Sequence, residues 1–291
     1  MRVAVAAALA ALLACVGVTS STPAARGADD LVFSGLGTWV DIYDGWVYAA
    51  PEQTAARIAA RGVDTVWVET ANYRSSADVV SSARLARFVD ALHASGVNVV
   101  AWYLPGHVNV ALDIRRALAM LAFRTPSSGA FDGVALDVES TKIANVAVRS
   151  RRAVALAQRV RQAAADMPFA IIPFNPRGLE LHPRTWPRFP WAQLAATSDA
   201  FAPMIYTGSS MKGFDATYGY VTRALRLLRT DTARPDVPIH VVGGVANRLG
   251  PDELAGFAAA LTDDGNTIGV SLYDWTTTTP ADWQVLGSLS G

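Results

Sequence analysis

Two carboxylates separated by one residue are the feature of this sequence that most directly suggests chemistry. Asp137 and Glu139 end the segment Gly133–Glu139, in which apolar residues occupy the alternate positions. Alternate side chains of a strand point to opposite faces, so these two share a face and lie about 6.6 Å apart along the strand. Crowding carboxyl groups in a partly dry site raises a pKa, which keeps one acid protonated near neutral pH. We therefore interpret Glu139, at the outer end, as a proton donor and Asp137 as an ionised group that stabilises positive charge.

Strand-like and helix-like segments alternate eight times after residue 30, which places this pair within a regular architecture. The strand candidates are Thr38–Tyr43, Thr65–Thr70, Asn98–Leu104, Gly133–Glu139, Phe169–Asn175, Ala200–Tyr206, Ile239–Val245 and Ile268–Trp275. Helical periodicity is clearest at Glu52–Arg61, Ala77–Ala94, Arg149–Ala165 and Tyr218–Arg229. The order predicts an α/β fold, a single (βα)8 TIM barrel over residues 30–291. An open doubly wound sheet is disfavoured, because no glycine-rich phosphate loop joins a strand to a helix.

The C-terminal ends of the strands carry the reactive groups in such barrels. These ends supply Asp41, Asp44, Glu69, Asn72, Trp102, Tyr103, Asp137, Glu139, Asn175, Tyr206, Asn247, Tyr273, Asp274 and Trp275. Carboxylates, amides and aromatic rings together suit a sugar, although aromatic residues also simply fill barrels. The predicted substrate-binding residues are Trp275, Tyr103, Asn175, Glu69, Asp41, Tyr273 and Met204, and Tyr206 joins Asp137 and Glu139 as a catalytic residue.

The segment that ends at Glu139 resembles the DxxDxDxE signature of family-18 glycoside hydrolases, the chitinase-like barrels. Asp132, Asp137 and Glu139 match that signature, whereas Ala135 stands where the family has another Asp. The resemblance implies that Glu139 is the general acid. It also implies that Asp137 orients the N-acetyl group of the substrate as an internal nucleophile, as in substrate-assisted enzymes.

Two further segments are similar to the same family. Met204-Ile205-Tyr206 resembles its Met-x-Tyr, whose Tyr supports the N-acetyl group, and Trp275 resembles its tryptophan beneath the reacting sugar. Thr207 replaces the usual Asp, and the third strand lacks the family's Ser-x-Gly-Gly. These departures, with Ala135, leave a catalytically inactive, lectin-like carbohydrate-binding barrel as an alternative.

The pair Asp137-Val138-Glu139, together with Asp41 on the first strand, also resembles family-25 muramidases. Both families cut bonds next to N-acetylhexosamine. The two resemblances therefore imply a glycoside hydrolase acting on a polysaccharide or oligosaccharide that contains this sugar.

The first 29 residues have the features of a secretory signal peptide. Met1-Arg2 precedes an apolar run to Val18 that is too short to span a bilayer, and small and polar residues follow it to Asp29. We expect a secreted, bacterial-type protein with no transmembrane segment after cleavage. Leu12-Leu13-Ala14-Cys15 also resembles a lipobox, so a lipid-anchored cell-wall scaffold is a second alternative.

Composition excludes several other classes. Lys+Arg 25 balances Asp+Glu 25 and 51% of residues are hydrophobic, which argues against a nucleic-acid partner and against a disordered chain. The single cysteine and four histidines form no zinc motif. We expect no metal, no cofactor and a monomer.

Overall fold

The computed structural model of the chain describes residues 32–208 and 211–289. The predicted signal peptide and Cys15 lie outside these residues. No helix in the described ranges combines the length and the apolar character needed to cross a membrane.

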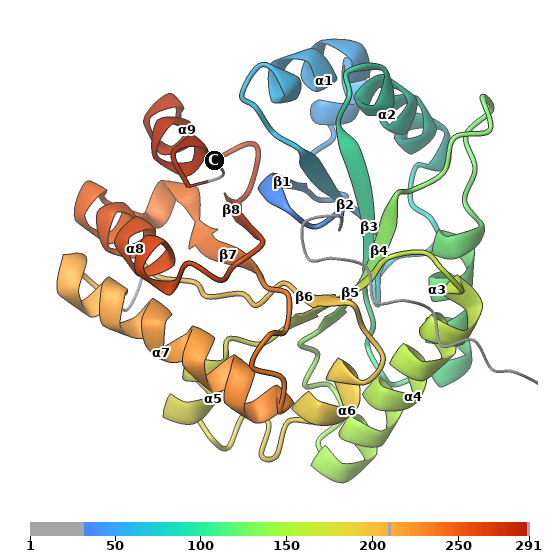
Figure 1. The fold of residues 1–291 in the computed structure, drawn as a ribbon. Helices are drawn as coiled ribbons and strands as arrows, with labels where there is room; N and C mark the ends of the chain where they lie inside the picture. Colours follow the sequence, from blue (N-terminus) through green and yellow to red (C-terminus); the bar gives the residue numbers. More distant parts are fainter. Residues whose placement is uncertain (1–31, 209–210, 290–291) are drawn as a thin grey trace, which may run out of the picture.

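Within the described ranges, eight parallel strands form the centre of the molecule (Figure 1). They are β1 (Gly35–Val40), β2 (Thr65–Asn72), β3 (Asn98–Leu104), β4 (Gly133–Val138), β5 (Phe169–Pro173), β6 (Ala200–Phe201), β7 (His240–Val245) and β8 (Gly269–Tyr273). The sheet runs β6-β5-β4-β3-β2-β1-β8-β7. Isolated bridges from Phe201 to Ile239 and from Met204 to Val242 join its two edges. The predicted (βα)8 TIM barrel is confirmed.

Helices form a ring around the strands (Figure 1). They are α1 (Pro51–Ala59), α2 (Ser82–Ala94), α3 (Val110–Ala122), α4 (Val146–Ala164), α5 (Pro176–Leu181), α6 (Trp191–Ala195), α7 (Phe214–Thr232), α8 (Pro251–Asp264) and α9 (Pro280–Gly287), with short 3-10 turns at Val47–Ala49 and Ala246–Arg248. The helix predicted from Ala77 begins only at Ser82, because the N–H of Val80 donates to the carbonyl of Thr70 (2.8 Å) instead of continuing a helix. Gly62 and Gly96 follow α1 and α2 at φ +73° and +74°, as expected for residues that end helices.

Alternation along each strand separates two apolar regions. On β4, Val134, Leu136 and Val138 pack into the core between the strands and the helices, whereas Ala135 faces the barrel interior. Ala135 pairs in register with Trp102 of β3. The small Ala135 side chain thus leaves room for the neighbouring indole in the barrel interior.

Tryptophans fill the barrel interior below the carboxyl ends of the strands. The ring of Trp67 stacks on Trp39 with centroids 4.7 Å apart. The indole Nε1 of Trp39 donates to Ser271 Oγ (2.8 Å), and Ser271 Oγ also contacts His240 Nε2 (2.9 Å). His240 Nδ1 donates to the carbonyl of Phe33 (2.7 Å), and burial lowers the pKa of His240 to about 4. The imidazole is therefore a neutral packing element in the barrel floor.

Candidate active site

A cavity of about 370 Å³ lies at the carboxyl ends of the strands, where active sites of such barrels are found. The residues that line it are Asp41, Tyr43, Glu69, Asn72, Tyr73, Arg74, Trp102, Leu104, Asp137, Glu139, Met204, Tyr206 and Tyr273. Most of the residues predicted from the sequence meet here. Tyr103, Asn175 and Trp275 do not.

The two β4 carboxyl groups both face this cavity, as the strand alternation predicted. Asp137 is 6% exposed, and its Oδ1 has no hydrogen-bond partner among the described residues. Burial raises the pKa of Asp137 well above its ordinary value, and the charges of Glu139 and Glu69 add to this rise. Burial also raises the pKa of the half-buried Glu139. These surroundings oppose the ionised form expected for Asp137, because its carboxyl group is buried and has two acidic neighbours.

Glu69 contributes a third carboxyl group from β2. Its Oε1 accepts a hydrogen bond from Asn72 Nδ2 (3.0 Å), and its Oε2 accepts one from the backbone N–H of Ile42 (3.2 Å). Burial raises the pKa of Glu69 to about 7, against the lowering effect of these two hydrogen bonds. Glu69 can therefore gain or lose a proton close to neutral pH.

Asp41 lines the cavity and connects the carboxyl ends of the first and last strands, β1 and β8. Its Oδ2 accepts a hydrogen bond from the hydroxyl of Tyr273 (2.8 Å), at the end of β8. Carboxylate oxygens of Asp41, Asp44 and Asp274 lie within 4.8 Å of one another, and burial with the charge of Asp41 raises the pKa of Asp44 to about 6. Oxygen ligands of this kind suit a hard cation. Each carboxylate, however, already accepts internal hydrogen bonds, for example Asp274 Oδ1 from the N–H of Thr277 (3.0 Å).

Tyr206 and Met204 reach the cavity from the segment that follows β6. Burial raises the pKa of the Tyr206 phenol, and the charges of Asp137 and Glu139 raise it further. The ring of Tyr206 lies 6.3 Å from that of Tyr273. Tyr206 therefore stays protonated and can donate a hydrogen bond beside the two carboxyl groups.

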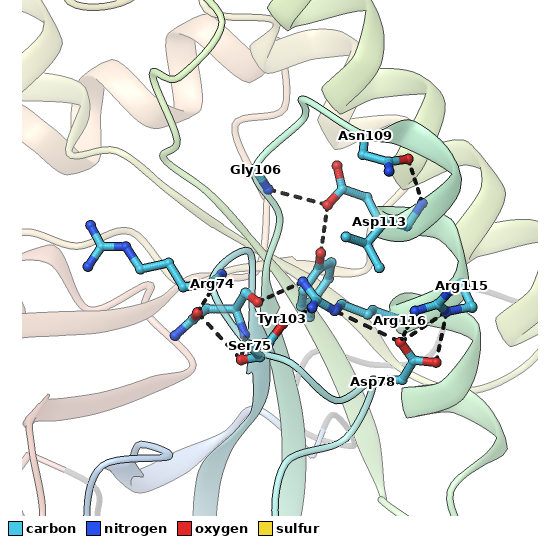
Figure 2. Close-up of polar contacts among 11 residues, drawn as sticks. Arg74, Ser75, Asp78, Tyr103, Gly106, Asn109, Asp113, Arg115 and Arg116 are labelled. Atoms are coloured by element: carbon cyan, nitrogen blue, oxygen red, sulfur yellow. Dashed lines mark hydrogen bonds and ion pairs between the residues drawn. The ribbon is translucent and has the colours of Figure 1, made fainter.

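Tyr103 points away from the cavity, which corrects the predicted sugar contact. Its side chain is fully buried between β3 and α3, and its hydroxyl donates to Asp113 Oδ1 (2.6 Å; Figure 2). On β3 it is Trp102 and Leu104 that line the cavity. Trp102 and Tyr103 are adjacent aromatic residues of β3, so they point to opposite faces of the strand, and it is Trp102 that faces inward.

Asn175 and Trp275 are also placed elsewhere. Asn175 caps α5, with Oδ1 accepting from the N–H of Arg177 (2.9 Å), and its Nδ2 donates to the hydroxyl of Tyr220 (2.9 Å). Trp275 lies beyond the end of β8 and packs on Trp283 of α9, with centroids 5.7 Å apart. Strand alternation does not extend past Tyr273, so Trp275 does not share its face.

Asp132, which matches the family-18 signature, serves the opposite end of β4. Its Oδ2 accepts hydrogen bonds from the N–H of Val99 (2.7 Å) and pairs with His93 Nε2 (2.9 Å). It therefore ties α2, β3 and β4 together and does not reach the cavity.

Six lining residues were not among the predicted catalytic and substrate-binding residues, although two of them, Asn72 and Trp102, had been placed at strand ends; the six are Tyr43, Asn72, Tyr73, Arg74, Trp102 and Leu104. Asn72 is the last residue of β2, and Tyr73 and Arg74 follow it directly. The buried Arg116 of α3 supports this segment. Arg116 donates to the carbonyl of Asn72 (2.8 Å) and to that of Ser75 (Figure 2). An arginine that faces inward on an amphipathic helix is the sequence signal that could have indicated a supported loop.

Comparison with known proteins agrees with this architecture. No family profile and no curated protein matches the sequence. A family-18 chitinase from Pseudoalteromonas aurantia superposes with a TM-score of 0.59 at 12% identity, over 86% of this chain and 97% of the chitinase chain. The Bacillus cereus spore cortex-lytic enzyme SleL gives 0.66 at 8% identity (89% and 74%), and the Rhizomucor miehei endo-1,4-β-mannanase gives 0.63 at 10% (89% and 94%). At these identities the likeness establishes the barrel fold.

Proposed function

We propose that this protein is a glycoside hydrolase that cuts a polysaccharide containing N-acetylhexosamine. The observation that carries the proposal is that Asp137 of β4 and Glu139, which directly follows this strand, both line the cavity at the carboxyl end of the barrel. Burial raises the pKa of Glu139, which favours the protonated form that a general acid needs.

In the proposed reaction Glu139 donates its proton to the glycosidic oxygen as the bond from that oxygen to the anomeric carbon breaks. Positive charge develops on the sugar, and the ionised carboxylate of Asp137 stabilises this charge. Asp137 enters the reaction already ionised and loses no proton in it, and the developing positive charge offsets the cost of burying its carboxylate. Water then adds to the anomeric carbon and returns a proton to Glu139, so the enzyme is regenerated. Tyr206 holds the substrate by donating its hydroxyl proton in a hydrogen bond.

The substrate class is supported by resemblance. The β4 segment resembles family-18 enzymes, and its Asp-x-Glu with Asp41 resembles family-25 muramidases. The structural neighbours include a chitinase and a spore cortex-lytic enzyme. We further propose secretion after removal of residues 1–29, with residues 30–291 acting as one monomeric domain. Mass spectrometry of the native N-terminus distinguishes this from acylation at Cys15.

A second candidate is a carbohydrate-binding barrel without turnover. It is favoured by Ala135, which packs among interior tryptophans where the family-18 signature has a carboxylate. Such a protein would bind glycan through the same cavity.

The test is release of reducing ends from chitin oligomers and from peptidoglycan, with the wild type and Glu139→Gln. Turnover that collapses in the variant supports the hydrolase, and the preferred polymer identifies the substrate. Saturable binding with no turnover on either polymer favours the second candidate.

A further inference from the structure

The segment between β1 and α1 carries two exposed aromatic side chains, Tyr43 and Trp46, and Tyr43 lines the cavity. It turns back on itself through hydrogen bonds from the N–H of Gly45 to the carbonyl of Tyr43 (2.8 Å) and from the N–H of Val47 to Asp44 (2.9 Å). Tyr43 lines the cavity and yet is 70% exposed, and Trp46 is 52% exposed. Among the large apolar side chains of the described residues, none is more exposed than Tyr43.

The exposed ring of Tyr43 is held in place by the protein. Its hydroxyl accepts a hydrogen bond from Asn72 Nδ2 (3.0 Å), and the same amide nitrogen contacts Glu69 Oε1 (3.0 Å). Asn72 is itself 5% exposed and its carbonyl accepts from Arg116 (2.8 Å). A side chain that is fixed before a ligand arrives loses less conformational entropy on binding.

No aromatic ring within residues 32–208 and 211–289 stacks on Tyr43. The contrast is Phe214, which is 43% exposed at the start of α7 but stacks on Tyr218 at 6.2 Å with an interplanar angle of 9°. A large aromatic face that is ordered, exposed and uncovered is suited to binding a flat apolar surface.

A glycan polymer would have to pass over this rim. The cavity of about 370 Å³ lies at the small end of the range for ligand pockets, about 300–1,000 Å³. It therefore accommodates the reacting part of a chain, and the sugars beyond that part must lie outside it. Tyr43 both lines the cavity and extends from it, so it stands where such a chain would leave.

We propose that Tyr43 is a stacking platform for a sugar ring next to the catalytic cavity, and that Trp46 extends the same surface along the glycan. The ligand class is a polymeric glycan whose pyranose C–H face packs on the phenol ring. This inference rests on the proposed function and adds that the protein acts on long chains.

The experiment compares kcat/KM for a trisaccharide and a hexasaccharide of the polymer that the wild type cuts. The ratio of kcat/KM for the long substrate to that for the short one should fall about two- to twelvefold in Tyr43→Ala, since one aromatic contact of about 0.5–1.5 kcal/mol is lost. Tyr43→Phe keeps the ring and should lose less, and Trp46→Ala should show a smaller fall of the same kind. Phe214→Ala is the matched control for removing an exposed aromatic ring and should keep the wild-type ratio.

An unchanged ratio in Tyr43→Ala, or equal losses on both lengths, would overturn the platform while leaving the hydrolase intact. If the wild type shows no turnover at all, the proposed function fails, and the platform is tested by retardation in gels that contain soluble chitin. Weaker retardation of Tyr43→Ala than of Phe214→Ala would then support it. Equal mobility of the two variants and the wild type would overturn it.

Discussion

The side-chain amide of Asn72 donates a hydrogen bond of 3.0 Å to Oε1 of Glu69, at the carboxyl end of strand β2. A hydrogen bond to a carboxylate favours its ionised form, so this contact opposes the rise in pKa that burial imposes on Glu69. The charge of Glu69 in turn raises the pKa of Asp137. Changes at Asn72 or Glu69 should therefore be measurable at the β4 carboxyl pair.

Asn72→Ala should raise the pKa of Glu69 above its value of about 7, because a hydrogen bond to the carboxylate is lost. Carbon-13 NMR of protein labelled at the glutamate carboxyl carbons measures this titration. Asn145→Ala removes an asparagine that caps α4 and should leave the titration of Glu69 unchanged. A Glu69 titration in Asn72→Ala identical to that of the wild type would contradict the assignment.

Glu69→Gln should alter how stability depends on pH. A carboxyl whose pKa is raised from 4.5 to about 7 on folding binds more protons in the folded state between these pH values. Its contribution to stability is fully present below pH 4.5 and is lost as pH rises through about 7. The free energy of unfolding of Glu69→Gln, relative to wild type, should therefore increase over this window by up to about 3 kcal/mol. Urea unfolding at several pH values measures it, and a pH-independent difference would show that Glu69 keeps its ordinary pKa.

The same variant should shift the pH dependence of catalysis. Removing the charge of Glu69 lowers the pKa of Asp137, so the ionised form required for catalysis persists to lower pH. The acid limb of the kcat/KM profile should therefore move to lower pH in Glu69→Gln. An acid limb that stays in place would mean that it does not report on Asp137.

The same Tyr→Phe substitution should have different effects at a residue that lines the cavity and at a residue in the core. Tyr206→Phe removes a hydrogen-bond donor inside the cavity and should lower kcat/KM at least about tenfold, with little change in stability. Tyr103→Phe removes the donor to the buried Asp113 and should lower the free energy of unfolding by about 1–3 kcal/mol with activity retained. A loss of activity in Tyr103→Phe without a loss of stability would contradict the placement of Tyr103.

The sequence was most informative where strand alternation was unambiguous. On β4, valine and leucine occupy the outward positions, so the inward position of Asp137 and Glu139 follows directly, and both line the cavity. On β3 both Trp102 and Tyr103 suit either face. The choice depends on whether Asp113 of α3 lies within reach of the phenol, which is a tertiary contact.

Other features depended on where an element ends. Trp275 follows the last residue of β8, so its direction is set by packing on α9 and not by the strand. Asn175 precedes Pro176 at the start of a helix, a position typical of a cap, and this local signal could have been used. The roles of Asn72 and Tyr43 arise from a contact between the last residue of β2 and the segment that follows β1, which one sequence does not specify.

The central claim is that Glu139 is the general acid. The most direct test is whether the fall in kcat caused by Glu139→Gln depends on the leaving group of the substrate. Glu139→Gln should lower kcat by about 10²–10⁴-fold on a natural oligosaccharide, whose leaving oxygen needs a proton. The loss should be much smaller on an aryl glycoside with a nitrophenol leaving group, which departs without one. Glu52→Gln, an exposed glutamate on α1, is the control and should match the wild type on both. Equal losses on the two substrates, or no loss on either, would contradict the account.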